Sequence, residues 1–110
     1  MTDPVKELEN LKSMHSGAVL LKEGGQPVAL LPAFGFIAGD RPHQMDLLLV
    51  PFAHSGYVTR LFFENKIEGR AANWNQHRIV DRNWWAPSWN NVPATMKWTQ
   101  MLSAHLRAVA

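Results

Sequence analysis

The sequence predicts an α+β domain with an N-terminal helix, a four-stranded antiparallel meander, a long irregular loop and a C-terminal helix. Three observations support this order. Apolar residues recur at helical spacing near both ends of the chain, four apolar runs bounded by turn residues lie between them, and no sustained period follows the fourth run. Helices at the two ends of such a chain can pack on one face of the sheet.

The first helix is expected at residues 3–14. Asp3 suits the N-cap and Pro4 the first helical position. Apolar residues then recur every third position from Val5 to Leu11, with charged residues between them. This pattern is typical of an amphipathic helix that covers one face of a sheet.

Four strands are expected at residues 18–22, 28–36, 44–50 and 59–63. Glycine-containing turns separate them, and the short spacings favour hairpins. Pro32, inside the second strand, indicates a bulge or an edge because proline cannot donate to a sheet ladder.

The segment from Glu64 to about Asn91 has no regular period and is expected to be an irregular loop. A loop of this length is uncommon in a small domain unless it is functional. A second helix is expected after Pro93, with one apolar stripe made by Trp98, Met101, Leu102, His105, Leu106 and Val109. On this stripe His105 is expected to be packed and hydrogen-bonded.

Composition limits the function classes. The 110 residues form one expected domain, 1–110, and the net charge of +2 lacks the dense basic cluster of a nucleic-acid surface. No apolar run is long enough to cross a bilayer, and no secretory signal opens the chain. The absence of cysteine excludes disulfides, thiolate metal sites and a thiol nucleophile, and it fits a cytoplasmic protein. No cofactor is indicated.

Four of the five tryptophans lie between Asn73 and Asn91. One interpretation is that these rings anchor the loop to the core, and it predicts that Trp85 and Trp89 are at least half buried. The alternative is an exposed aromatic patch that binds a protein partner. The candidate binding residues are Asn75, Arg78, Trp74, Trp84 and Tyr57.

His77 is the histidine with catalytic potential. Asp81 follows it by four residues and could orient it as a general base, while Asn75 or Arg78 could stabilise developing negative charge. His77 and Asp81 are therefore the candidate catalytic pair of a small hydrolase or transferase. The same side chains could instead satisfy loop backbone groups. No histidine pair has the spacing of a helical metal site, so no metal is expected.

The element order and local sequence resemble the ubiquitin-conjugating enzyme (UBC) fold. Val50–Tyr57 is similar to the approach to the Tyr-Pro turn of that family, although Val58 replaces the proline. Leu61–Ile67 resembles its fourth strand and exit, and Trp85–Pro87 resembles its Trp-x-Pro element. The sequence is most similar to the divergent bacterial branch of the superfamily, and the resemblance spans nearly the whole chain.

Two departures change what the resemblance implies. The chain has neither the His-Pro-Asn motif nor any cysteine, and counting back from Trp85 places the usual cysteine near His77, or near Asp81 or Asn83 if the loop is longer. Without a thiolate no ordinary thioester can form. The resemblance then implies an accessory component that binds a ubiquitin-like protein or an activating-type enzyme, with possible association with a JAB-type metallopeptidase. A homodimeric interaction module is a further alternative.

Overall fold

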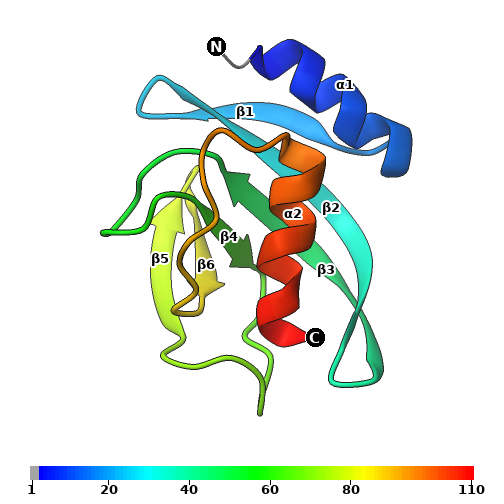
Figure 1. Cartoon of the computed structure of the whole chain (residues 1–110), viewed down its shortest axis with the longest axis vertical. Coiled ribbons are helices and arrows are strands. Elements are labelled where there is room, and N and C mark those ends of the chain that lie inside the picture. The colour runs from blue at the N-terminus through cyan, green and yellow to red at the C-terminus, as the bar shows by residue number, and fades with distance from the viewer. Residues whose placement is uncertain (1–2) are drawn as a thin grey trace.

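The computed structural model describes residues 3–110, in which one six-stranded antiparallel sheet carries a helix from each end of the chain (Figure 1). The elements follow in the order α1 (Pro4–Met14), β1 (Val19–Glu23), β2 (Gln26–Ala38), β3 (Arg41–Val50), β4 (Arg60–Phe63), β5 (Asn75–Ile79), β6 (Arg82–Ala86), α2 (Trp98–Leu106) and the 3-10 turn η1 (Arg107–Val109). Within this part of the chain, neither helix has both the length and the apolarity needed to cross a membrane.

Helix α1 begins as the sequence predicts. The Asp3 carboxylate accepts hydrogen bonds from the backbone N–H groups of Val5 and Lys6, at 3.1 and 3.4 Å. These bonds satisfy two of the donors that the first helical turn leaves free. Leu8 and Leu11 of the predicted apolar side are buried, whereas Val5 is 62 % exposed.

Strands β1 to β4 form an antiparallel meander close to the predicted positions. The register between β2 and β3 shifts between Leu31 and Phe34, so the bulge predicted at Pro32 is confirmed. Ala33 adopts a positive φ of 48° there, and its N–H donates to the Asp46 carboxylate at 2.8 Å. A side chain on β3 therefore satisfies the backbone donor at this bulge.

The predicted four-stranded sheet and irregular tryptophan loop are wrong, because β5 and β6 form a hairpin that extends the sheet. The strand order is β1-β2-β3-β4-β6-β5, and Phe63 pairs with Trp85 where β6 joins β4. Val80 and Asp81 make the hairpin turn with φ values of 46° and 63°, as a favoured two-residue loop requires. The alternation of β5 is hidden in the sequence because its residues are mostly polar.

The helix-side face of the sheet carries the larger core. Alternate residues of β2, β3 and β4 point to this face, including Leu31, Leu47 and Phe63, and they pack with α1 and α2. The predicted start of α2 just after Pro93 is wrong, since the helix begins at Trp98. The Trp98 N–H donates to the Glu7 carboxylate at 2.8 Å, so a side chain of α1 caps α2.

The opposite face, here named the second face, has its own buried core of Val28, Leu48, Val50, Phe62, Ile79, Trp84 and Ala86. Neither helix contributes to this cluster. Ile79 and Trp84 come from the β5–β6 hairpin, and the Val80 N–H donates to the Glu23 carboxylate at 2.7 Å. This bond joins the tips of the first and last hairpins, so the sheet curls over its second face.

Candidate functional site

The polar groups with the most chemical potential gather at one end of the second face. We name His54, Tyr57, Arg60, Phe62 and His77 the second-face cluster. Strand alternation places Arg60 and Phe62 on the same side of β4, and His77 reaches this side from β5, opposite Trp84. Two residues of the cluster come from the turn before β4, where His54 and Tyr57 form an antiparallel bridge.

Arg60 lies at the centre of the second-face cluster. It is 4 % exposed, its Nη2 donates to the Pro87 carbonyl at 3.0 Å, and its guanidinium lies 4.2 Å from the centroid of the Tyr57 ring. In residues 3–110 ion pairs are made by Lys66 and Arg82, and Arg60 has no carboxylate partner. A cation removed from water without an anion is costly, so this position is suited to receive one.

Two imidazoles lie beside this cation. The His54 and His77 ring centroids are 5.4 Å apart, and His77 Nε2 lies 3.4 Å from Arg60 Nη1. Because a guanidinium can only donate, His77 accepts through Nε2 and carries its proton on Nδ1. Burial lowers the pKa of both histidines below 6.5, and the charge of Arg60 lowers it further. Both rings are therefore neutral near pH 7.

The second-face cluster is better suited to an anion than to a metal. No group of three or more His, Asp or Glu side chains within the described residues 3–110 is arranged to hold a metal ion. The Arg60 guanidinium also repels a cation placed between the two imidazoles. Tyr57, His54 and His77 are each partly exposed, so a ligand can approach the cluster across these rings.

The predicted catalytic pair is not brought together. His77 contacts His54, Phe62 and Arg60 on the second face, whereas Asp81 is exposed in the β5–β6 turn. The Asp81 backbone carbonyl accepts from Arg78 Nη2 at 3.0 Å, and no hydrogen bond or ion pair joins Asp81 to His77. His77 therefore lacks the carboxylate that would orient it as a general base.

The remaining predicted residues divide between the surface and the core. Asn75 is exposed and donates to the Asn73 carbonyl at 3.0 Å. Trp84 is fully buried and its Nε1 donates to the Ile79 carbonyl at 3.1 Å, so it is part of the core and not a binding surface. Trp74 is partly buried against Phe63, with ring centroids 5.3 Å apart.

Tyr57 is the one predicted binding residue that joins His77 in the second-face cluster. Its hydroxyl donates to Ser88 Oγ at 2.9 Å. The prediction that Trp85 and Trp89 are at least half buried is confirmed. Trp85 is partly buried, and Trp89 is 37 % exposed with Nε1 donating to the Ala104 carbonyl at 3.1 Å.

The expected packing of His105 is confirmed. Its Nε2 lies 2.9 Å from Thr59 Oγ1, which donates its only proton to the Val92 carbonyl at 2.8 Å. The proton on His105 must therefore be on Nε2. Burial lowers the pKa of His105 to about 4, and the charge of Arg60 contributes less.

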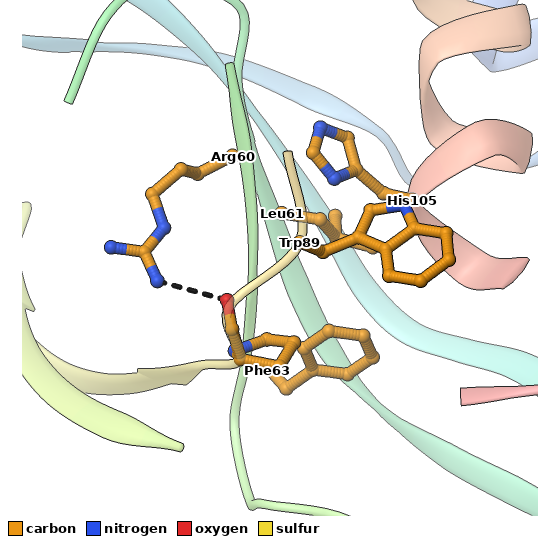
Figure 2. A pocket seen from close by; sticks show the side chains of 6 residues that line it. Arg60, Leu61, Phe63, Trp89 and His105 are labelled. Atoms are coloured by element: carbon orange, nitrogen blue, oxygen red, sulfur yellow. Dashed lines mark hydrogen bonds between the residues drawn. The ribbon is translucent and has the colours of Figure 1, made fainter. Parts of the chain in front are cut away.

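A small cavity lies between His105 and the cluster (Figure 2). Its volume is about 10 Å³, and it is lined by Arg60, Leu61, Phe63, Pro87, Trp89 and His105. This volume holds at most about one water molecule. The cavity is therefore too small for a substrate.

Sequence reasoning missed Arg60 and His54. No motif marks either residue, because their role depends on side chains that meet only after the hairpin joins the sheet. The one available signal was a charged residue, Arg60, at the start of an otherwise apolar strand. Such a residue is either paired by a distant carboxylate or kept for a ligand.

Comparisons of the chain with protein-family models, with curated proteins and with solved structures find no match.

Proposed function

We propose that the chain is a non-thioester binding component of a ubiquitin-like modification system. On this proposal it binds a ubiquitin-like protein or an activating-type enzyme and receives an anionic group of that partner at Arg60. A cytoplasmic location is part of the same proposal. The observation that carries the binding site is the burial of Arg60 without a carboxylate partner among residues 3–110.

The order of elements supports the proposed system. Helix α1 and the antiparallel strands β1 to β4 come first and α2 comes last, as in the family that the sequence resembles, but the β5–β6 hairpin lies between β4 and α2 and adds two strands to the sheet. The β5–β6 hairpin occupies the stretch in which that family has its active-site segment. His77 lies in this hairpin, and no cysteine is present to form a thioester.

The chemistry of the second-face cluster supports binding over catalysis. Arg60 donates to the Pro87 carbonyl and is held over the Tyr57 ring, so its guanidinium is ordered before a partner arrives. An ordered guanidinium binds a carboxylate with little further loss of side-chain entropy. The neutral imidazoles of His54 and His77 can add hydrogen bonds to the same group.

The test measures binding by calorimetry to a bacterial ubiquitin-like protein and, separately, to an activating-type enzyme. We expect saturable binding to one of them. Arg60→Met should weaken that binding by about 10- to 100-fold, because a charge-assisted hydrogen bond contributes about 1.5–3 kcal/mol.

Arg82→Met is the matched control. It also removes a guanidinium from the second face, but Arg82 already pairs with Asp46 and Glu64. This variant should bind like the unmodified chain. If neither partner binds, the proposed function is wrong; if one binds and Arg60→Met has no effect, the proposed position of the binding site is wrong.

A further inference from the structure

A second candidate binding site lies on the other side of the molecule, beyond the C-terminal end of α2. It is a groove of about 570 Å³ between the β2–β3 turn and the segment 65–70, and we name it the hairpin-tip groove. Its floor includes Ala38, Met45 and Ile67, which belong to the core on the helix-side face. The groove is therefore separate from the second-face cluster.

The side chains that line the hairpin-tip groove carry more positive than negative charge. Arg41, Lys66 and Arg70 line it, and Glu68 is the only acidic residue in the lining. Lys66 Nζ lies 3.5 Å from the Glu68 carboxylate, whose side chain is 84 % exposed. Exposed pairs of this kind contribute about 1 kcal/mol or less, so Glu68 does not tie up the positive charge of the groove.

Arg70 is held in place before any ligand binds. Its Nη1 donates to the Ala110 carbonyl at 3.2 Å. Its guanidinium also lies against the β2–β3 turn, where a Cβ on Gly39 would be 2.5 Å from Arg70 Nε. Gly39 has a φ of 56°, a conformation that glycine favours, and a side chain there would displace the Arg70 guanidinium.

We propose that the hairpin-tip groove binds a small phosphate-bearing molecule. The lining side chains are three cations and one carboxylate, so the groove is positive, although the carboxyl group of Ala110 lies beside Arg70. A phosphate monoester carries about −1.5 to −2 near pH 7 and presents three acceptor oxygens, so it can pair with more than one of these cations. The fork of an arginine also matches two phosphate oxygens at once.

The size of the groove favours a small molecule over a macromolecular surface. Small-molecule sites usually enclose about 300–1,000 Å³. At about 570 Å³ the groove is within this range. This inference does not rest on the proposed function, because it uses a different face and different residues.

The experiment titrates the isotope-labelled chain with inorganic phosphate and, in a separate arm, with adenosine monophosphate, and follows the backbone amides by NMR. We expect saturable shifts at residues 38–45 and 65–70. Stronger binding of the nucleotide would identify a phosphate ester as the ligand, and equal binding would identify free phosphate. Shifts spread over all basic residues without saturation would overturn the proposal.

Two variants and two controls locate the effect. Arg70→Ala should weaken phosphate binding by at least about tenfold. Gly39→Ala should do the same, because its Cβ displaces the Arg70 guanidinium. Gly24→Ala has a similar φ of 58° with no atom within 4 Å of its Cβ, and it should bind normally.

Lys12→Ala removes one positive charge from α1 and should also bind normally. Equal weakening by Lys12→Ala and Arg70→Ala would mean that only the net charge matters, and would overturn the site. Tight binding of citrate in place of phosphate would overturn the ligand class.

Discussion

Two arginines on the second face of the sheet have similar aromatic contacts and different charge partners. Arg60 lies 4.2 Å from the centroid of the Tyr57 ring, and Arg82 lies 4.2 Å from that of Trp84. Arg82 Nη1 is 2.9 Å from an Asp46 carboxylate oxygen. Arg60 is more buried than Arg82 but has a backbone carbonyl in place of a carboxylate.

The difference shows which arginine has its charge paired by carboxylates within residues 3–110. Asp46 also accepts from the Ala33 N–H, and this bond and Arg82 together hold the pKa of Asp46 below 3.8 despite its partial burial. We name the surroundings of Arg82 and of Arg60 on the second face the Arg82 end and the Arg60 end. At the Arg82 end, the charge of the arginine is paired with carboxylates of the same chain. The Arg60 end has the desolvation cost of a buried cation without the compensating anion. A partner that supplies the anion would make the two ends alike.

The largest expected effect is on the free energy of unfolding, which should depend on pH over different ranges at the Arg60 end and the Arg82 end. Burial lowers the pKa of His105 from 6.5 to about 4, so the unfolded chain takes up a proton that the folded chain does not. The free energy of unfolding should then fall by about 3 kcal/mol as pH drops from 6.5 to 4. The lowered pKa values of His54 and His77 act in the same direction.

The contribution of the Arg82 end to the free energy of unfolding is lost at a lower pH than that of His105. The lowered pKa of Asp46 gives stability that is present above 3.8 and is lost as pH falls through its folded-state value. Urea unfolding from pH 7 to pH 3 would measure both windows. His105→Gln keeps an N–H donor for Thr59 and should flatten the slope between pH 6.5 and 4. An unchanged slope in this variant would contradict the assignment to His105.

A smaller effect is expected from removing each guanidinium. Arg82→Met should lower the free energy of unfolding by about 1 kcal/mol, because it breaks the partly exposed ion pairs with Asp46 and Glu64 and the cation–π contact with Trp84. Arg60→Met should change it less, since loss of the bond to Pro87 is offset by removal of a desolvated charge. Chemical denaturation at pH 7 measures both. A larger loss from Arg60→Met would indicate a structural role for Arg60.

The smallest effect concerns the two imidazoles of the second-face cluster. Arg60→Met should raise the pKa of His54 and His77, because the nearby positive charge lowers both. Each pKa should stay below 6.5, since burial is the larger cause and remains. NMR titration of the imidazole C–H signals measures the change. Arg82→Met should leave both values unaltered, and equal shifts in the two variants would remove the distinction between the two ends.

Local signals predicted much of the fold. The N-cap at Asp3, the four strands of the meander and the bulge beside Pro32 depend on residues close together in sequence. The β5–β6 hairpin was missed because its strands carry few alternating apolar residues. It joins the sheet where Phe63 pairs with Trp85, and Trp84 is buried on the second face. Contacts between residues this far apart in sequence can override local propensity.

The candidate site was only partly predicted. His77 and Tyr57 were named from the sequence, but Asp81 was assigned to His77 from its spacing in a supposed loop. In a hairpin the same spacing places Asp81 in the turn and His77 on the second face. The sequence predicts Trp84 as a binding residue, but Trp84 is buried in the second-face core. Its burial depends on the curl of the sheet, which the sequence pattern does not show. The local signal for Arg60 was only that a charged residue begins an apolar strand.

The sequence by itself determined the α+β class, the α1 cap, the meander and the absence of thiol chemistry, because each depends on composition or on neighbouring residues. Only the tertiary structure decided that the tryptophan-rich segment is a hairpin and that Asp46 and Glu64 pair with Arg82. The same folding left Arg60 buried without a carboxylate partner among residues 3–110. Charge pairing is set by which side chains meet in space, and the curl of the sheet brings both acids to one arginine and neither to the other.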